Sequence, residues 1–208
     1  MIAPFAGNLV PTLAPGKEHR QLIRARKLPE LIAREAGIVF SPVEHEDNVQ
    51  FSDDEVAQIR EIVGELIGRP KTGSDGGPAG AITLKDILFV APYNVQVRRL
   101  REALGPGARV GSVDKFQGQE ADIVILSMCS SFGHYGSRGL EFILDQNRLN
   151  VALSRARILA VVVGDPRIAS TPCHTIDSMR RVNLYCRLSR GLSESCAATG
   201  RNTPAART

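Results

Sequence analysis

The chain has 208 residues, 43% of them hydrophobic, which suits one globular domain of about 150 residues with looser ends. Its formal net charge of +4 is compatible with a nucleic-acid partner without requiring one, and an aromatic content of 5% leaves few side chains for stacking on bases. The cysteines form no C-x-x-C pair, and no apolar run has membrane-spanning length, so we predict no metal site, no membrane partner and a cytoplasmic protein.

The first part of the chain is a lead-in followed by an edge strand. Residues 1–37 carry no motif and are expected to be a partly ordered N-terminal segment, in which Leu22–Ala36 could form one helix. Ile38–Val43 is a predicted strand. Pro42 favours an edge position, because proline cannot donate a hydrogen bond to a neighbouring strand.

A helix is predicted over Ser52–Ile67. Ser52 and Glu55 fit the capping box, in which each side chain accepts a hydrogen bond from the backbone N–H of the other. The following residues, 68–80, are rich in glycine and proline and are predicted to form a flexible loop.

Strands and helices then alternate. Further strands are predicted at Ile87–Ala91, Arg109–Val113, Ile123–Met128 and Ile158–Val163, and helices at Asn94–Leu104, Asn147–Leu153 and Ile176–Leu188. This order predicts an α/β fold, a three-layer parallel sheet of about five strands with helices on both faces. The domain is expected to span residues 38–190, with residues 191–208 as a disordered tail.

Two polar clusters adjoin the most apolar strands. One reads DKFQGQE from Asp114 to Glu120. The other reads NRLN from Asn147, followed by SRAR from Ser154. Because α/β proteins place ligand sites at the ends of buried parallel strands, these clusters are the candidate functional residues.

Three segments resemble helicase motifs in the expected order. Val113–Glu120 resembles motif V of superfamily 1 helicases, Asn150–Arg157 resembles motif VI, and Ala91–Gln96 resembles motif IV with its Pro-Tyr-x-x-Gln core intact. The likeness is greatest to helicases of nonsense-mediated decay and Okazaki-fragment processing, and among these to bacterial relatives fused to a RecB-like nuclease. It implies the second RecA-like, P-loop NTPase-type domain of a helicase motor, of the kind that serves DNA repair or RNA processing.

The phosphate-binding half of such a motor is missing from the sequence. The G-x-x-x-x-G-K-[ST] loop that holds phosphates is absent, since Lys71-Thr72 follows Pro70 with no strand before it. Asp53-Asp54-Glu55, a tempting set of Mg²⁺ carboxylates, follows a poor strand and is interpreted as a helix start. We therefore expect ATP with Mg²⁺ to bind only when a first RecA-like domain completes the site.

The resemblance implies an arginine finger from motif VI. Arg155 occupies the motif's arginine position, and a planar, permanently charged guanidinium matches the oxygens of a transferring phosphoryl group. Arg157 and Arg148 are weaker candidates, and either could pair with Glu120 or Asp145 instead.

Motif V implies contacts with the nucleotide. Gln117, Gly118 and Glu120 carry this motif, and the resemblance places Glu120 on the ribose, where a carboxylate can accept a hydroxyl hydrogen bond. The alternative is that Glu120 caps a turn or pairs with Lys115.

Motifs IV and V also imply contacts with the backbone of single-stranded nucleic acid. Hydrogen bonds of this kind position a strand without reading its sequence. Tyr93 could stack on a base, although a tyrosine beside a buried strand more often belongs to the core. The candidate residues are Tyr93, Asn94, Gln96, Ser112 and Asp114.

Two functions remain open from the sequence. The first is the second motor domain of an ATP-dependent DNA or RNA helicase or translocase, truncated or split. Its partners would be single-stranded nucleic acid, a first RecA-like domain and a candidate RecB-like nuclease module. The second is an ATPase-inactive module for nucleic-acid binding or protein interaction. The missing phosphate cradle favours the second function for the isolated chain, and the intact motif VI favours the first for its ancestry.

Overall fold

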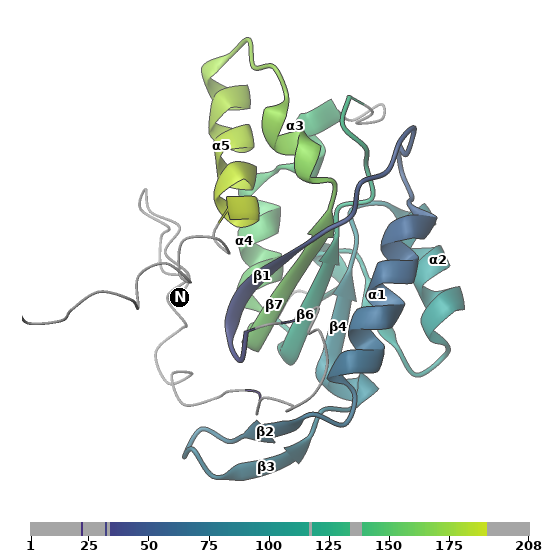
Figure 1. The fold of residues 1–208 in the computed structure, drawn as a ribbon, viewed down its shortest axis with the longest axis vertical. Coiled ribbons are helices and arrows are strands. Elements are labelled where there is room, and N and C mark those ends of the chain that lie inside the picture. The colour runs from purple at the N-terminus through teal and green to yellow at the C-terminus, as the bar shows by residue number, and fades with distance from the viewer. Residues whose placement is uncertain (1–21, 23–31, 33, 117, 134–138, 191–208) are drawn as a thin grey trace, which may run out of the picture.

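The computed structural model describes residues 22, 32, 34–116, 118–133 and 139–190. Its centre is a parallel five-stranded sheet in the order β1-β7-β6-β4-β5 (Figure 1). The position of β1 at one edge agrees with the presence of Pro42. The strands are β1 (Gly37–Pro42), β4 (Ile87–Val90), β5 (Arg109–Gly111), β6 (Ala121–Ser127) and β7 (Ala156–Gly164).

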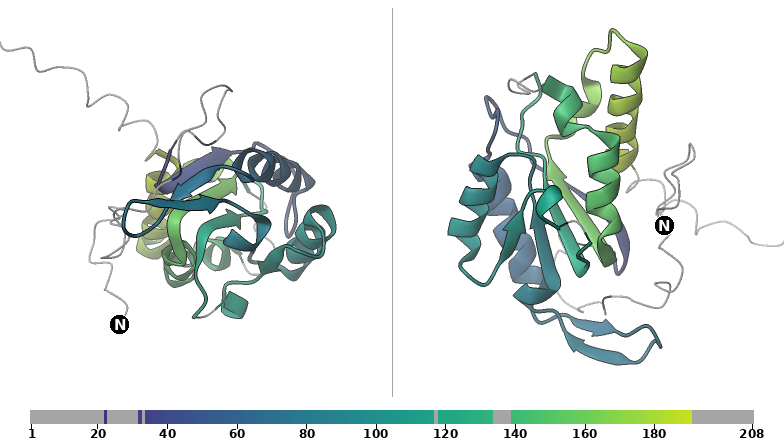
Figure 2. Two further views of the ribbon diagram at one scale, coloured as in Figure 1. Left: turned by 90° about the horizontal axis from the view of Figure 1, so that it is seen from below. Right: turned by 180° about the vertical axis from the view of Figure 1, so that it is seen from behind.

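Helices cover both faces of the sheet, as Figures 1 and 2 show. On one face, α1 (Asp53–Leu66) and α2 (Asn94–Leu104) enclose a core that includes Ile59 and Leu100. On the other, α3 (Gly139–Ile143), α4 (Gln146–Ser154) and α5 (Ile176–Arg190) enclose a second core around Leu149 and Tyr185. The molecule therefore has the three-layer α/β architecture of a RecA-like domain. Short 3-10 helices η1 (Leu84–Asp86), η2 (Asp114–Phe116) and η3 (Pro166–Ser170) complete it.

The start of α1 agrees only in part with the predicted capping box. Ser52 Oγ accepts a hydrogen bond from Glu55 N at 3.1 Å, as expected. The Glu55 side chain, however, turns into the protein interior, and Ser52 N donates to Gln96 Oε1 at 3.0 Å instead. The reciprocal half of the prediction is wrong because buried donors elsewhere compete for the Glu55 carboxylate.

Residues 68–80 contain an ordered hairpin rather than a flexible loop. β2 (Pro70–Thr72) and β3 (Pro78–Ala81) pair in antiparallel fashion, and Gly73 N donates to Gly77 O across the turn at 2.7 Å. Lys71 fixes the hairpin to the main sheet by contacting Asp122 of β6.

The candidate helix over residues 22–36 is not formed where the structure describes it. Leu22 pairs with Lys71 in an isolated antiparallel bridge, and Ile32 and Arg34 lie outside any helix. Residues 23–31 and 33 of that segment and the expected tail, 191–208, lie outside the described residues. Within the described part of the chain, no helix is long and apolar enough to cross a membrane.

Gly164, the last residue of β7, allows a close contact between the sheet and α5. A Cβ atom there would lie 2.8 Å from Tyr185 Oη and 2.9 Å from Met128 Cγ. We expect Gly164→Ala to lower the free energy of unfolding by about 1–3 kcal/mol, measured by urea denaturation, because the added methyl overpacks the core. Gly64→Ala is the control: an added Cβ in this α1 position meets nothing within 4 Å, so stability should rise by about 0.5–1 kcal/mol. An unchanged Gly164→Ala protein would contradict the described packing.

Candidate functional site

The predicted site residues separate onto two opposite edges of the sheet. At the carboxyl edge, where β4 and β5 end, the chain leads into Asn94 and Ser112. At the amino edge, where β6 and β7 begin, the preceding residues are Glu120 and Arg155. The motif V segment and α4 each run from one edge to the other. Both polar clusters were expected at the strand ends where α/β proteins form ligand sites, which are the carboxyl ends. That expectation therefore describes only the residues at the carboxyl edge.

The amino edge brings Glu120, Arg155 and Arg157 together. Ala121 N donates to Arg155 O at 3.1 Å, and β6 pairs with β7 in parallel from this point. Arg157 Nε donates to Glu120 Oε2 at 3.0 Å, in a pair that is partly exposed. Arg157 thus forms the alternative pairing with Glu120 considered from the sequence, whereas the alternative pair between Glu120 and Lys115 is not the one observed.

Arg155 differs from the other arginines of this region. Its Nε is enclosed and has no hydrogen-bond partner among the described residues. The same holds for Asn150 Oδ1 on the same helix. Buried polar atoms are usually satisfied, so both atoms retain hydrogen-bonding capacity that the described residues do not use, as do Arg69 Nε and Arg181 Nε elsewhere in the fold.

The motif V turn preceding β6 depends on glycine. Gly118 has a φ angle of 79°, which lies in the region that favours glycine and permits close approach of the backbone. Gln117, the other candidate in this turn, lies outside the described residues.

The carboxyl edge contains a cavity of about 380 Å³, which we call the edge groove. Of the predicted nucleic-acid residues, Tyr93, Asn94, Ser112 and Asp114 line it. Tyr93 is only 6% exposed, with its ring 5.2 Å from that of Phe142, so its main environment is the core. The groove is lined by Gln50, Pro92, Tyr93, Asn94, Val95, Ser112, Asp114, Phe142 and Arg148.

Arg148 belongs to the edge groove. Its guanidinium lies 4.6 Å above the Phe142 ring and 3.5 Å from Asp114 Oδ2, while its backbone N donates to Asp145 Oδ1 at 2.8 Å. This position separates Arg148 from Glu120 and Arg155, so it does not fit the role of an alternative arginine finger.

Gln96, also expected to contact nucleic acid, is not among the residues that line the groove. Its side chain is fully buried, and its Nε2 donates to Ser127 Oγ at 2.8 Å. Its Oε1 accepts from Ser52 N. The motif IV glutamine therefore joins the starts of α1 and α2 to the end of β6.

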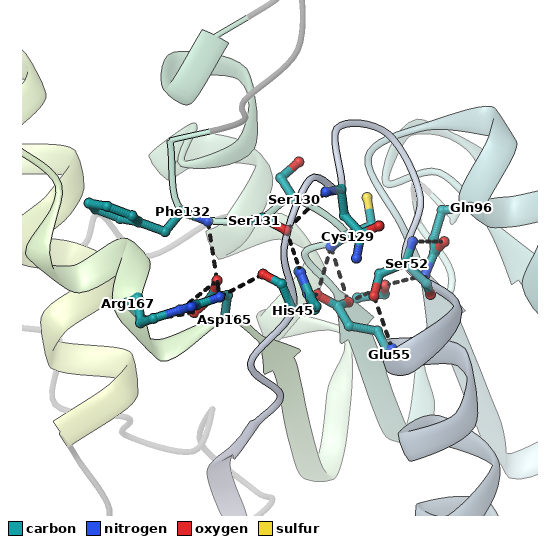
Figure 3. Close-up of polar contacts among 12 residues, drawn as sticks. His45, Ser52, Glu55, Gln96, Cys129, Ser130, Ser131, Phe132, Asp165 and Arg167 are labelled. Atoms are coloured by element: carbon teal, nitrogen blue, oxygen red, sulfur yellow. Dashed lines mark hydrogen bonds and ion pairs between the residues drawn. The ribbon is translucent and has the colours of Figure 1, made fainter.

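A buried polar network centred on Glu55 lies beside the end of β6 (Figure 3). Both Glu55 carboxylate oxygens lie 3.0 Å from the donating Cys129 N, and Ser127 Oγ donates to Oε2. His45 Nε2 lies 3.0 Å from Oε1, and His45 Nδ1 lies 2.7 Å from Ser131 Oγ. The sequence contained one signal of this network, the Ser52–Glu55 spacing, and that signal predicted only a local cap.

Ser131, His45 and Glu55 are hydrogen-bonded in series, as are the serine, histidine and carboxylate of a hydrolase triad, but all three residues are buried. Their exposed fractions are 1%, 5% and 0%, respectively, and Ser131 Oγ already accepts from Asn48 N at 3.0 Å. A nucleophile must reach its substrate, so this arrangement serves structure and not hydrolysis.

Two further groups complete the network. Burial favours the neutral form of Asp165, but hydrogen bonds from Arg167 and from Phe132 N outweigh this effect and lower the pKa of the carboxyl group. Arg167 also donates to His45 O at 2.6 Å.

Burial, reinforced by the charge of Glu55, raises the pKa of the Cys129 thiol well above its usual value, so this cysteine is an unreactive core thiol.

Comparisons with known proteins identify the family of this chain. Residues 32–167 match a family described as AAA domain. The chain belongs to this family. It is 32% identical over 180 residues to MOV-10 of Gallus gallus, which is named as a helicase, covering 76% of this chain and 18% of that protein.

Two other relatives are named for related activities. The chain is 36% identical over 118 residues to Regulator of nonsense transcripts 1 homolog of Arabidopsis thaliana, covering 56% of this chain and 9% of that protein. It is 38% identical over 80 residues to ATP-dependent helicase upf1 of Schizosaccharomyces pombe, covering 38% of this chain and 8% of that protein. The chain spans less than a fifth of the length of these relatives.

The hydrogen bonds to Glu55 should contribute to the free energy of unfolding, and this can be tested. Glu55→Ala would leave Cys129 N, the Ser127 hydroxyl and the His45 imidazole without their acceptor, so we expect the free energy of unfolding to fall by at least about 3 kcal/mol. Glu61→Ala, an exposed change on the same helix, should alter it by less than about 0.5 kcal/mol. Urea denaturation of both variants measures the difference. A similar, small effect of the two substitutions would contradict the role of Glu55.

Proposed function

We propose that this chain is the second RecA-like motor domain of an ATP-dependent helicase or translocase. The observation that supports the proposal most directly is the guanidinium Nε of Arg155 at the amino edge, which is enclosed and has no hydrogen-bond partner among the described residues. The order of motifs IV, V and VI along the chain and the helicase names of the relatives point the same way.

The amino edge suits a nucleotide held between this domain and a first RecA-like domain. Arg155 would face the transferring phosphoryl group, Glu120 would accept from a ribose hydroxyl, and Gly118 with Gln117 would form the adjoining turn. ATP with Mg²⁺ supplies the phosphoryl group whose charge an arginine finger stabilises. The described residues contain no cluster of three or more His, Cys, Asp or Glu side chains suited to a metal, so the Mg²⁺ ligands and the phosphate cradle are assigned to the first domain.

The contacts of Arg148, Arg155 and Arg157 differ, and they favour Arg155 as the arginine finger. Arg157 is engaged by Glu120 at 3.0 Å, and Arg148 is shared between Asp114 and the Phe142 ring. A finger must direct its guanidinium to phosphoryl oxygens, and Arg155 has an Nε that no described residue engages. Glu120 would reach a ribose by exchanging or sharing its contact with Arg157.

The edge groove is the proposed contact with single-stranded nucleic acid. The adjoining helix α2 begins at Asn94, and its N-cap residue Tyr93 makes no side-chain capping bond. The first turn of α2 also contains no acidic residue. Its free N–H groups and the positive end of its dipole would attract a backbone phosphate.

A second candidate function follows from the same division of the molecule. The edge groove is complete within this chain, whereas the nucleotide site needs a partner domain. The isolated chain is therefore proposed to act as an ATPase-inactive nucleic-acid-binding module. In the complete protein we propose the first RecA-like domain and a RecB-like nuclease as partners in DNA repair or RNA processing.

The nucleotide proposal predicts a specific loss of rate. The isolated chain should release no phosphate from ATP, and fusing a first RecA-like domain to it should create an ATPase. In that fusion, Arg155→Lys should leave the KM for ATP nearly unchanged but lower kcat, because lysine keeps the charge and loses the planar fork. Arginine fingers contribute roughly 10³–10⁵ in rate in other phosphoryl-transfer systems, and a smaller factor is expected if domain closure limits turnover.

The matched control is Arg157→Lys, two residues along the chain, which should change kcat much less. Glu120→Ala should mainly raise the KM for ATP, because a sugar contact is made equally in the ground and transition states. Steady-state kinetics of the three variants decide the assignment. A kcat for Arg155→Lys within a few-fold of the parent would mean that Arg155 is not the finger.

The strand proposal predicts weak, salt-sensitive binding without sequence preference. Affinity for a fluorescent single strand should fall steeply as salt rises, because binding releases counterions. Asn94→Asp places a carboxylate at the start of α2 and should weaken binding several-fold, whereas Asn183→Asp, the same change at an exposed position of α5, should weaken it less. Fluorescence anisotropy measures both. Binding that is absent at low salt, or restricted to one sequence, would contradict the proposal.

A further inference from the structure

We infer that the outer edge of the sheet, along β5, is a docking surface for the backbone of double-stranded nucleic acid. The surface, which we call the basic edge, consists of Arg98, Arg101, Arg109 and Lys115. None of these four residues lines the edge groove. The inference rests on the proposed function only in taking the docked duplex to continue into the single strand held by that groove.

Two cationic side chains converge on the edge strand β5, which pairs with β4 on one side only. Arg101 Nη2 donates to Val110 O at 3.0 Å, and Lys115 Nζ donates to the same oxygen at 3.2 Å. A carbonyl oxygen carries only a partial charge, so it accepts a hydrogen bond from each cation and neutralises neither. Both side chains keep further N–H donors for an anion outside the sheet.

The stem of Lys115 is held in place by its packing against β5. Gly111 has no side chain, and an added Cβ there would lie 2.5 Å from Lys115 Cδ and 3.1 Å from Phe116 Cε2. The stem therefore lies directly over β5, and its ammonium group is 5.8 Å from the centre of the Phe116 ring. A side chain that is already ordered loses little conformational entropy when it binds an anion.

Arg98 and Arg109 extend the surface on either side of this pair. Arg109 Nη1 donates to Lys85 O at 3.2 Å and its Nη2 donates to Gln119 Oε1 at 3.0 Å, and both of these acceptors are uncharged. Arg98 is exposed one helical turn before Arg101 on α2. The cations thus follow the outer side of β5 and α2.

The basic edge carries positive charge that the described residues do not neutralise. No carboxylate among them forms an ion pair with its four cations, whereas Arg99 on the same helix pairs with Asp53. The carboxylates next to the surface in sequence are Glu102 and Asp114, and Asp114 already lies 3.5 Å from Arg148. Because four cations exceed these two carboxylates, the surface attracts a polyanion.

The surface offers no platform on which bases could stack. The exposed aromatic side chains of the described chain are Phe51 and Phe132, and neither lies on β5, η2 or α2. Phe116, beside Lys115, is only 4% exposed. Proteins that bind single strands combine cations with aromatic stacking, whereas a duplex hides its bases and presents phosphates along its outside. Cations without a stacking platform therefore fit a duplex backbone.

The position of the basic edge favours nucleic acid over an acidic protein segment. Lys115 directly follows Asp114, which lines the edge groove. A duplex that sends one strand into the groove would therefore meet the basic edge with its phosphates. An acidic protein segment would satisfy the same charges, but it has no corresponding connection with the groove.

The test compares a short, blunt-ended DNA duplex with one of its strands alone. Each is titrated with the full chain at low salt and followed by fluorescence anisotropy. Arg101→Gln and Lys115→Gln should each weaken duplex binding about two- to fivefold, as expected for one exposed charge contact. Each should also lower the slope of log affinity against log salt by roughly one, because one fewer phosphate is neutralised. Binding of the single strand should change much less.

Two control variants separate this surface from general charge effects and from the groove. Arg180→Gln removes the same charge from an exposed position on α5, a helix that packs against β1 at the opposite edge of the sheet, and should affect the duplex less. Asn94→Asp, at the edge groove, should weaken the single strand more than the duplex. Circular dichroism confirms that each variant is folded.

The outcomes distinguish the basic edge from the proposed strand site. An unchanged duplex affinity and salt slope in both Arg101→Gln and Lys115→Gln would overturn the basic edge, even where Asn94→Asp still weakens the single strand. Displacement of the labelled duplex by polyglutamate as effectively as by unlabelled duplex would also overturn it and would assign the surface to acidic protein segments. Duplex binding that depends on Arg101 and Lys115, with no binding of the single strand, would support the basic edge and contradict the strand site.

Discussion

A single buried carboxylate, that of Glu55, constrains the carboxyl edge of the sheet. A charged group without water must be satisfied by hydrogen bonds, and here the donors are Cys129 N, the Ser127 hydroxyl and the His45 imidazole. They come from the end of β6 and from the segment between β1 and α1. The carboxylate accepts all of these hydrogen bonds only when the two segments are in contact. The same contact holds the loop that carries Gln50, which forms one wall of the edge groove.

The two functional edges are physically connected through the same elements. Helix α4 carries Arg148 into the groove near its first turn and ends beside Arg155 at the amino edge. The motif V segment, from Asp114 to Glu120, also runs from the carboxyl edge to the amino edge. α4 has nine residues and spans the distance between the two edges. In a motor this is the geometry by which nucleotide contact and strand contact would depend on each other.

Much of the fold followed from local patterns, and the exceptions have physical causes. The alternation of strands and helices, and the edge position that Pro42 imposes on β1, depend on short-range chemistry. The hairpin at residues 70–81 was missed because glycine and proline signal a turn without specifying which strands pair across it. The surroundings of Glu55 and Gln96 were not predicted, because their partners Ser127 and Cys129 lie 31 to 74 residues away and local rules do not weigh distant donors.

The candidate site shows the same limit more sharply. Residues within one motif can belong to different edges, because a segment that links parallel strands leaves one carboxyl end and enters the next amino end. Three arginines between positions 148 and 157 were therefore equivalent in type and close in sequence, and the motif position alone favoured Arg155. Their partners differ: Asp114 and Phe142 engage Arg148, Glu120 engages Arg157, and the enclosed Nε of Arg155 has no partner among the described residues. The motif identifies the three candidate arginines. The contacts that each makes in the folded structure distinguish them.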